Sequence, residues 1–207
     1  MIVNDPRESA LLEKKGILFA VADGLGGMEH GEMASAAAIL HLDHLFKDLE
    51  ELKEPDWLRQ AVGAVNQKIY QINKGLDSSE WMGTTLTASI FFKDELVTAH
   101  VGDSRMYQVR DGRICCLTTD HSVDRYTLTR VIGVGPDVAV DLYRMPLKKG
   151  DTYLQCSDGL YSMVSDDELL RGVSSSSVKE GCQRLVAMAN ENGGADNITL
   201  QLVRVEE

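Results

Sequence analysis

The spacing of apolar residues changes character along this chain. Residues 16–23 form a short apolar run that ends beside glycines, which predicts a buried strand. Residues 31–49 and 54–74 carry apolar side chains at helical spacing, which predicts two amphipathic helices. Because only a short link separates the two helices, we expect them to pair.

From the middle of the chain onward the pattern is typical of strands. Four strands joined by short links are expected at residues 84–92, 95–101, 105–109 and 113–117. Short links imply antiparallel neighbours. Residues 118–136 show no regular period, and further strands are expected at 138–144 and 152–156. A helix at about 177–191 and a strand at 197–205 follow.

Clustered strands flanked by helix pairs predict an α+β sandwich rather than a parallel sheet of βαβ units. The chain has 207 residues, of which 43% are hydrophobic. This length and composition suit one compact domain, and we expect residues 1–207 to form a single domain.

The charge balance narrows the class of partner. The formal net charge is -11 and the pI is about 4.9. Nucleic acids and anionic membranes would be repelled at long range, so we expect neither as a partner, whereas metal cations would be attracted. An acidic surface also serves solubility alone. Without an apolar run of membrane-spanning length or a secretion signal, the expected location is cytoplasmic.

The cysteines give no sign of a disulfide framework or a zinc site. None of the four belongs to a C-x-x-C pair, and all occur in apolar runs: Cys115, Cys116, Cys156 and Cys182. We expect them to be small buried side chains in a reducing compartment.

Three aspartates share one kind of position. Asp23, Asp158 and Asp196 each lie near glycine at the edge of an apolar run. A carboxylate at the end of a buried strand is held rigidly, and a nearby glycine allows backbone and ligand to approach closely. Any one such aspartate is also typical of an ordinary turn. Three together favour an oxygen-rich site for a hard divalent cation such as Mg²⁺ or Mn²⁺.

Six short motifs carry a resemblance to a known family. In chain order they are Asp23-Gly24-Leu25-Gly26-Gly27, Gly31-Glu32 with Ala34-Ser35, Gly83-Thr84-Thr85, Gly102-Asp103-Ser104-Arg105, Ser157-Asp158-Gly159 and Asp196-Asn197. Their sequence and order resemble the signature motifs of bacterial metal-dependent serine/threonine protein phosphatases of the PP2C type. The resemblance extends from about residue 4 to residue 202.

The resemblance implies a fold and a metal site. The fold is a β-sandwich of two antiparallel sheets flanked by pairs of antiparallel helices. The site holds two Mn²⁺ or Mg²⁺ ions, with Asp23 bridging both. The carbonyl of Gly24 completes the coordination of one ion, and Asp158 and Asp196 bind the other.

Two further ligands are implied by motif position. Asp5, in Asn4-Asp5, resembles the residue that holds a metal-bound water. Asp120, in Thr-Thr-Asp-His-Ser, resembles the residue that helps Asp158 to bind a third and weaker ion. All of the implied catalytic residues are therefore carboxylates.

The implied activity is hydrolysis of phosphoserine and phosphothreonine in proteins that a serine/threonine kinase has phosphorylated. A water that bridges the two ions attacks phosphorus, and no covalent intermediate forms. The sequence agrees, because it contains neither a cysteine followed six residues later by arginine nor an Asp-x-Asp pair. These absences disfavour the phosphocysteine and phosphoaspartate routes.

Several nearby polar residues have more than one interpretation. His121 is a candidate general acid for the leaving alkoxide, although a histidine in a loop often has no chemical role. His100 is expected to make a structural hydrogen bond. Asp103 and Arg105, at a strand junction, are expected to support the site without binding the ions.

The chain departs from the family pattern in two places. The family's first strand and a phosphate-binding arginine would fall just before Met1, and only eight residues separate Asp120 from Thr129, where bacterial relatives carry a longer flap. A second hypothesis is therefore a pseudophosphatase, or regulatory module, that only binds phosphoproteins. A third is an unrelated carboxylate-metal hydrolase that acts on a small phosphate ester.

Overall fold

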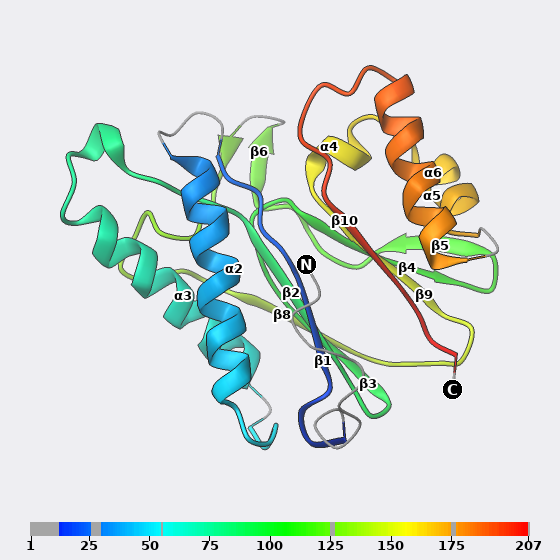
Figure 1. Cartoon of the computed structure of the whole chain (residues 1–207), viewed down its shortest axis with the longest axis horizontal. Coiled ribbons are helices and arrows are strands. Elements are labelled where there is room, and N and C mark those ends of the chain that lie inside the picture. Colours follow the sequence, from blue (N-terminus) through cyan, green and yellow to red (C-terminus); the bar gives the residue numbers. More distant parts are fainter. Residues whose placement is uncertain (1–12, 26–29, 55, 125–126, 175–176, 207) are drawn as a thin grey trace. The chain divides into compact units, whose positions relative to one another are not determined.

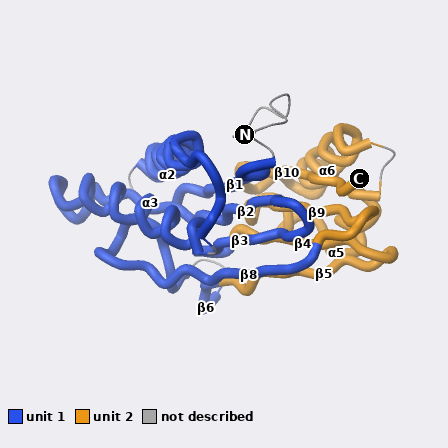
Figure 2. The backbone as a smooth tube through the Cα atoms, turned by 90° about the horizontal axis from the view of Figure 1, so that it is seen from below, with its two compact units in different colours: residues 1–103, 121–146 blue, residues 104–120, 147–207 orange. Residues whose placement is uncertain are grey.

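The computed structural model describes residues 13–25, 30–54, 56–124, 127–174 and 177–206. The chain divides into two compact units (Figure 2). The first consists of Met1–Asp103 and His121–Pro146, and the second of Ser104–Asp120 and Leu147–Glu207. The chain thus leaves the first unit for a hairpin, returns to it, and leaves again.

The first unit is a four-stranded antiparallel sheet with two helices on one face. The strands, in sheet order, are β1 (Ile17–Val21), β2 (Leu86–Phe92), β3 (Glu95–Val101) and β8 (Asp141–Pro146). Helices α2 (Gly31–Asp48) and α3 (Trp57–Asn73) run side by side along the sheet (Figure 1). Among its described residues the unit also has three short elements: the 3-10 helix η1 (Ser78–Glu80) and the paired strands β6 (Ser122–Asp124) and β7 (Thr127–Leu128).

The helical spacing of the sequence accounts for this packing. Ala34, Ala38, Leu42 and Phe46 recur every four residues along α2, and all are buried. Small residues in the first half of the stripe let α2 approach the sheet closely, and larger ones fill the second half. They join side chains from α3 and the sheet in one hydrophobic core.

A buried lysine ties the start of the sheet to the end of α2. Lys15 precedes β1 and is only 4% exposed. Its Nζ donates to the carbonyls of Phe46 at 2.9 Å and Leu49 at 3.0 Å. These carbonyls belong to the last turn of the helix, where no intrahelical donor remains for them. The lysine therefore satisfies carbonyls at the C-terminus of α2 and ties this end of the helix to β1, the strand that leads to Asp23.

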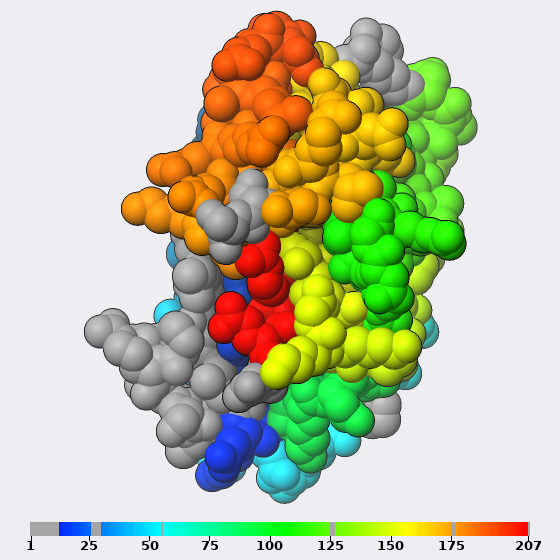
Figure 3. All heavy atoms as spheres, turned by 90° about the vertical axis from the view of Figure 1, so that its right-hand side faces the viewer, coloured from blue at the N-terminus to red at the C-terminus, as the bar shows by residue number. Residues whose placement is uncertain are grey.

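The second unit repeats this plan with different connections. Its antiparallel strands, in sheet order, are β10 (Leu200–Arg204), β9 (Thr152–Cys156), β4 (Arg105–Arg110) and β5 (Arg113–Cys116). Helices α4 (Asp158–Tyr161), α5 (Asp166–Val173) and α6 (Val178–Glu191) pack on it around a second hydrophobic core. Side chains of β10, the outermost described strand on its side, are visible at the surface in Figure 3.

Most predicted elements are confirmed, with specific exceptions. Helices α4 and α5 were not predicted, β8 begins three residues after the expected start at 138, and the irregular segment 118–136 contains β6 and β7. The prediction that all four cysteines are buried is confirmed for Cys156 and wrong for Cys115 and Cys116, which are exposed on β5, while Cys182 is half-buried. Whether the chain forms a single domain stays a prediction.

No helix in the described part of the chain is long and apolar enough to cross a membrane.

An ion pair joins Arg110 of β4 to the buried Asp151, which directly precedes β9. The Asp151 side chain is 2% exposed and accepts from Arg110 Nε at 2.7 Å and Nη2 at 2.6 Å. The backbone N–H of Lys148 and the hydroxyl of Tyr153 also donate to it, both at 3.0 Å. Burial acts to raise the pKa of Asp151, but these hydrogen bonds outweigh it and lower the pKa.

We expect Asp151→Ala to lower the free energy of unfolding at pH 7 by about 2 kcal/mol, since it leaves Arg110 without its counter-ion. The full penalty for a buried pair is not expected, because the Arg110 side chain is 27% exposed. The folded-state pKa of Asp151 is lowered, so its contribution is complete above the ordinary carboxyl pKa of 3.8 and disappears as the pH falls through the lowered value.

Urea unfolding at several pH values provides the measurement. The difference between wild type and Asp151→Ala should narrow below about pH 4. Asp94→Ala is the control, because Asp94 is exposed in the turn between β2 and β3. A difference that stays constant down to pH 2 would contradict this account of the pair.

Candidate active site

Asp23 lies just beyond β1, and its backbone is held on both sides by two threonines. Its N–H donates to Thr85 Oγ1 at 3.0 Å, and its carbonyl accepts from the Thr85 N–H at 2.8 Å and from Thr84 Oγ1 at 2.8 Å. Both threonines are at most 1% exposed. The backbone of Asp23 is thereby fixed by the two residues that directly precede β2.

The residue after Asp23 is packed against the first turn of α2. A Cβ built on Gly24 would lie 2.0 Å from the carbonyl oxygen of Gly31, and one on Gly31 would lie 2.6 Å from that of Leu25. Only glycine fits at either position, because backbone atoms cannot give way as a flexible side chain would. This contact explains why two separate motifs of the sequence are both glycine-containing.

A second layer of contacts holds the threonines. Thr84 exchanges backbone hydrogen bonds with Ile132, at 2.9 and 3.2 Å. The next residue, Gly133, donates to Asn66 Oδ1 at 2.8 Å and accepts from Asn73 Nδ2 at 2.9 Å. Both asparagines are buried in α3. Helix α3 thus anchors the segment that supports Thr84 and, through it, Asp23.

His121 links three segments of the first unit. Its Nδ1 accepts from the Gly102 N–H at 3.1 Å, and its Nε2 lies 3.1 Å from Asp141 Oδ2. Since Nδ1 accepts from a backbone N–H, a neutral ring carries its proton on Nε2 and donates it to Asp141, and Arg130 Nη1 lies 3.0 Å from the same Nε2. Arg130 Nη1 also donates to Asp141, at 2.6 Å. With both ring nitrogens engaged and only 6% exposure, the geometry favours a structural role for His121.

A second histidine, His100 of β3, lies next to His121 and extends this network into the sheet. The rings of His100 and His121 lie 4.6 Å apart, and His100 Nδ1 lies 2.9 Å from Thr87 Oγ1. The expectation that His100 makes a structural hydrogen bond is confirmed.

In the second unit, the segments that carry Asp158 and Asp196 touch each other. Asp158 is the first residue of α4, directly after β9, and Asp196 lies in the loop before β10. A Cβ on Gly159 would lie 2.2 Å from the Asn197 carbonyl oxygen and 3.4 Å from the Asp196 carbonyl carbon. Ser157 reinforces the contact, because its Oγ donates to the same Asn197 carbonyl at 3.2 Å.

The side chains of these two aspartates have oxygen atoms available for a cation. Asp158 is half-buried and, in the described part of the chain, has no hydrogen bond or ion pair at its carboxylate. Asp196 is exposed, and its Oδ1 accepts one backbone N–H, that of Asn197, at 2.7 Å. Two carboxylates on adjoining segments suit Mg²⁺ or Mn²⁺. Within the described ranges, no three His, Cys, Asp or Glu side chains form a metal-binding group.

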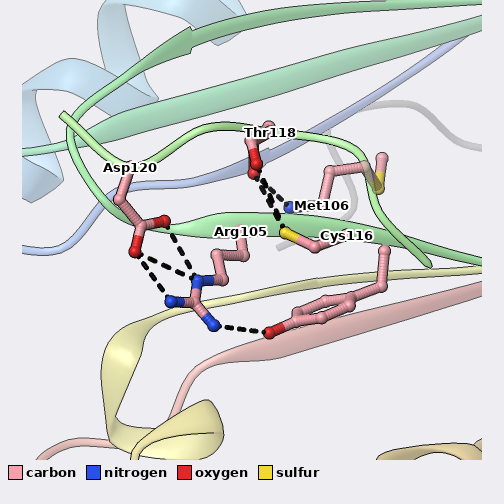
Figure 4. Close-up of polar contacts among 6 residues, drawn as sticks. Arg105, Met106, Cys116, Thr118 and Asp120 are labelled. Atoms are coloured by element: carbon pink, nitrogen blue, oxygen red, sulfur yellow. Dashed lines mark hydrogen bonds and ion pairs between the residues drawn. The ribbon is translucent and has the colours of Figure 1, made fainter. Parts of the chain in front are cut away.

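Asp120, the predicted ligand of a third ion, is held by Arg105 (Figure 4). Arg105 Nε donates to Asp120 Oδ1 at 3.0 Å and to Oδ2 at 3.2 Å, and Nη2 donates to Oδ2 at 2.7 Å. Arg105 Nη1 donates to the Tyr107 hydroxyl at 3.0 Å. Burial acts to lower the pKa of Arg105, but the hydrogen bonds with Asp120 and Tyr107 outweigh it and raise the pKa.

The sequence predicted the aspartates of the site, which stay a prediction, but not most of the residues that support them in the structure. Asp5, Asn4, Gly26 and Gly27 lie outside the described residues. The roles of Asn66 and Asn73 were missed, although two asparagines on the buried stripe of a predicted helix are a usable signal, because buried amides need partners. Arg105 was expected to support the site, but no signal in the sequence identified Asp120 as its partner.

Comparison with known proteins places these features in a family. A sequence model described as protein phosphatase 2C matches residues 4–202. The serine/threonine phosphatase stp of Listeria welshimeri is 35% identical over 207 residues, which cover 88% of this chain and 82% of the relative. PstP, a serine/threonine protein phosphatase of Mycobacterium tuberculosis, is 35% identical over 206 residues, covering 91% of this chain and 40% of PstP.

Solved structures agree with the sequence comparison. The S. agalactiae serine/threonine phosphatase has a TM-score of 0.84 at 31% identity, covering 92% of this chain and 88% of that one. The PstP catalytic domain in complex with two manganese ions has a TM-score of 0.82 at 34% identity, covering 92% and 88%. The predicted α+β fold of PP2C type is confirmed. The chain therefore belongs to the protein phosphatase 2C family of metal-dependent serine/threonine protein phosphatases.

Proposed function

We propose that this chain hydrolyses phosphoserine and phosphothreonine in proteins phosphorylated by a serine/threonine kinase of the same cell. It does so with two Mn²⁺ or Mg²⁺ ions held by Asp23, Gly24, Asp158 and Asp196, with Asp5 acting through water. The observation that carries the assignment is the backbone contact between Gly159 and Asn197, which brings the Asp158 and Asp196 segments together. The family match over residues 4–202 supports the activity.

The bound ions would supply an activated water and neutralise charge on the phosphoryl group. The protein's own contribution is to hold oxygen ligands rigidly. Asp23 has its backbone N–H and carbonyl fixed by Thr84 and Thr85, so its carboxylate starts from a defined position. Such preorganisation lowers the cost of ordering ligands when charge develops in the transition state.

A third ion at Asp120 and Asp158 is part of the proposal, as the weakest of the set. Asp120 already has a strong partner in Arg105, whereas Asp158 has none among the described residues. This difference supports weaker binding of the third ion than of the other two.

We place the activity in the cytoplasm. All four cysteines carry free thiols, which agrees with a reducing compartment. No observation on the described residues, and none of the relatives named above, favours the alternative of a module that only binds phosphoproteins.

We expect the wild-type protein to release phosphate from a phosphothreonine peptide in a Mn²⁺-dependent reaction. Asp158→Asn should lower kcat by about 10²-fold or more, because loss of a ligand costs at least as much as loss of a group that only orients one. Asp94→Asn, in an exposed turn, is the matched control and should leave the rate unchanged.

Two results would change the proposal. Phosphate release that survives in Asp158→Asn would overturn the assignment of the site. A wild-type protein that binds Mn²⁺ without releasing phosphate would favour the phosphoprotein-binding alternative.

We expect Gly159→Ala to weaken both the fold and the metal site. Its Cβ would collide with the Asn197 backbone, and overpacking of this kind costs about 1–3 kcal/mol. Separation of the two segments should also reduce the rise in unfolding temperature that Mn²⁺ produces. Gly63→Ala is the matched control, because a Cβ at Gly63 of α3 meets nothing within 4 Å.

Thermal unfolding with and without Mn²⁺ measures both effects. Gly63→Ala should gain about 1 kcal/mol from helix propensity and keep the full response to Mn²⁺. An equal response in Gly159→Ala would contradict the idea that this contact builds the site.

A further inference from the structure

The loop that carries Asp196 begins at the end of α6. Asn192 caps this helix, and the two glycines that follow have a positive φ, 124° at Gly193 and 53° at Gly194. The Gly194 N–H donates to the Ala189 carbonyl at 3.0 Å, which ends the helix as a C-terminal glycine commonly does. The residues from the first glycine to Asp196 are exposed, so the position of the aspartate depends on contacts at the two ends of the loop.

The first end of the loop is tied to the segment that carries Asp158. The side-chain amide of Asn192 donates from Nδ2 to the Met163 carbonyl at 2.8 Å. Met163 lies two residues after α4, the helix that begins with Asp158, and its own N–H donates to the Leu160 carbonyl at 3.1 Å. Leu160 is fully buried in the core of the second unit. The acceptor of the Asn192 amide therefore belongs to a turn that the core holds in place.

The second end of the loop is tied to the same segment. Ser157, directly before Asp158, is only 1% exposed. Its Oγ donates to the Asn197 carbonyl at 3.2 Å and accepts from the Thr199 N–H at 3.1 Å. The loop is thus fastened to the Asp158 segment both before and after Asp196. Figure 1 shows the chain running from α6 past α4 into β10.

We propose that Asn192 is a positioning residue for Asp196, whose side-chain amide sets how tightly the ion shared by Asp158 and Asp196 binds. The proposal rests on the proposed function, because it assumes that these two aspartates take an ion. Without the amide, the described loop is hydrogen-bonded to the Asp158 segment only after Asp196. The two glycines give the part before Asp196 conformational freedom. Binding of a cation then has to order the carboxylate, and the entropy lost in ordering weakens binding.

Calorimetric titration of the metal-free protein with Mn²⁺ measures this effect. Asp196→Asn first identifies the binding step that depends on Asp196. In Asn192→Ala, we expect the dissociation constant of that same step to rise by about fivefold. This is less than the roughly 10- to 100-fold typical of a group bonded directly to a metal ligand, because Asn192 acts through the backbone of a loop. Binding that does not depend on Asp196 should be unchanged.

Hydrogen exchange in the metal-free protein distinguishes positioning from a contribution to overall stability. The Asn197 N–H is bonded to Asp196 Oδ1 at 2.7 Å and should exchange faster in Asn192→Ala. Because Asn192 is exposed, the unfolding temperature of the metal-free variant should change little. A role in stability alone would instead lower the unfolding temperature and leave the Mn²⁺ affinity of the folded variant unchanged.

The same helix offers a matched control. Asn190 has the same side chain, is exposed in the last turn of α6, and has no side-chain hydrogen bond in the part of the chain that the structure describes. Asn190→Ala should therefore leave every Mn²⁺ affinity unchanged. Asn192→Leu keeps the approximate shape of the side chain and removes its amide, so it should weaken binding as Asn192→Ala does. It takes the place of Asn192→Ala should that variant fail to fold.

Two results separate this proposal from the function on which it rests. If Asp196→Asn binds Mn²⁺ as the wild type does, the proposed metal site fails and this inference with it. If Asp196→Asn weakens binding but folded Asn192→Ala and Asn192→Leu bind as the wild type does, only the positioning role is overturned. Adding Asn192→Ala to Asp196→Asn should weaken binding no further, because the amide acts through Asp196.

Discussion

The close backbone contact at Gly24 and Gly31 is the constraint on which the rest of the candidate site depends. A Cβ on Gly24 would lie 2.0 Å from a carbonyl oxygen of the facing segment. The contact fastens the residues after Asp23 to the start of α2. The second unit uses the same device at Gly159, against Asn197. In both places an aspartate precedes the glycine, so the carboxylate is held where backbone segments meet most closely.

These contacts work because the structure behind them is stiff. Thr84 and Thr85 form hydrogen bonds with the backbone of Asp23. Thr84 also forms backbone hydrogen bonds with Ile132. Buried Asn66 and Asn73 then lock the following turn to α3. Each of these polar groups is satisfied inside the core, where an unpaired one would be costly. A rigid support of this kind limits the ordering that ligands must undergo when cations bind.

Local signals in the sequence were sufficient for the aspartates and for most of the strands and helices. Helix α5 escaped because it has only 8 residues and begins with Asp166-Asp167-Glu168, too short a stretch for a clear apolar period. Cys115 and Cys116 were expected to be buried, but they are exposed because β5 lies at the edge of its sheet as the structure describes it. The Arg105–Asp120 pair joins residues 15 apart across a turn, and no local pattern announces such a partner.

Charge pairing distinguishes aspartates that look alike in sequence. Asp151 and Asp141 each have an arginine partner and serve to join strands and loops. Asp158 has no such partner among the described residues, so its carboxylate oxygens are available to a cation. Asp120 was predicted to bind a third ion, but its contacts in the structure are those of an ion pair with Arg105, so its carboxylate resembles Asp151 and Asp141 more than Asp158.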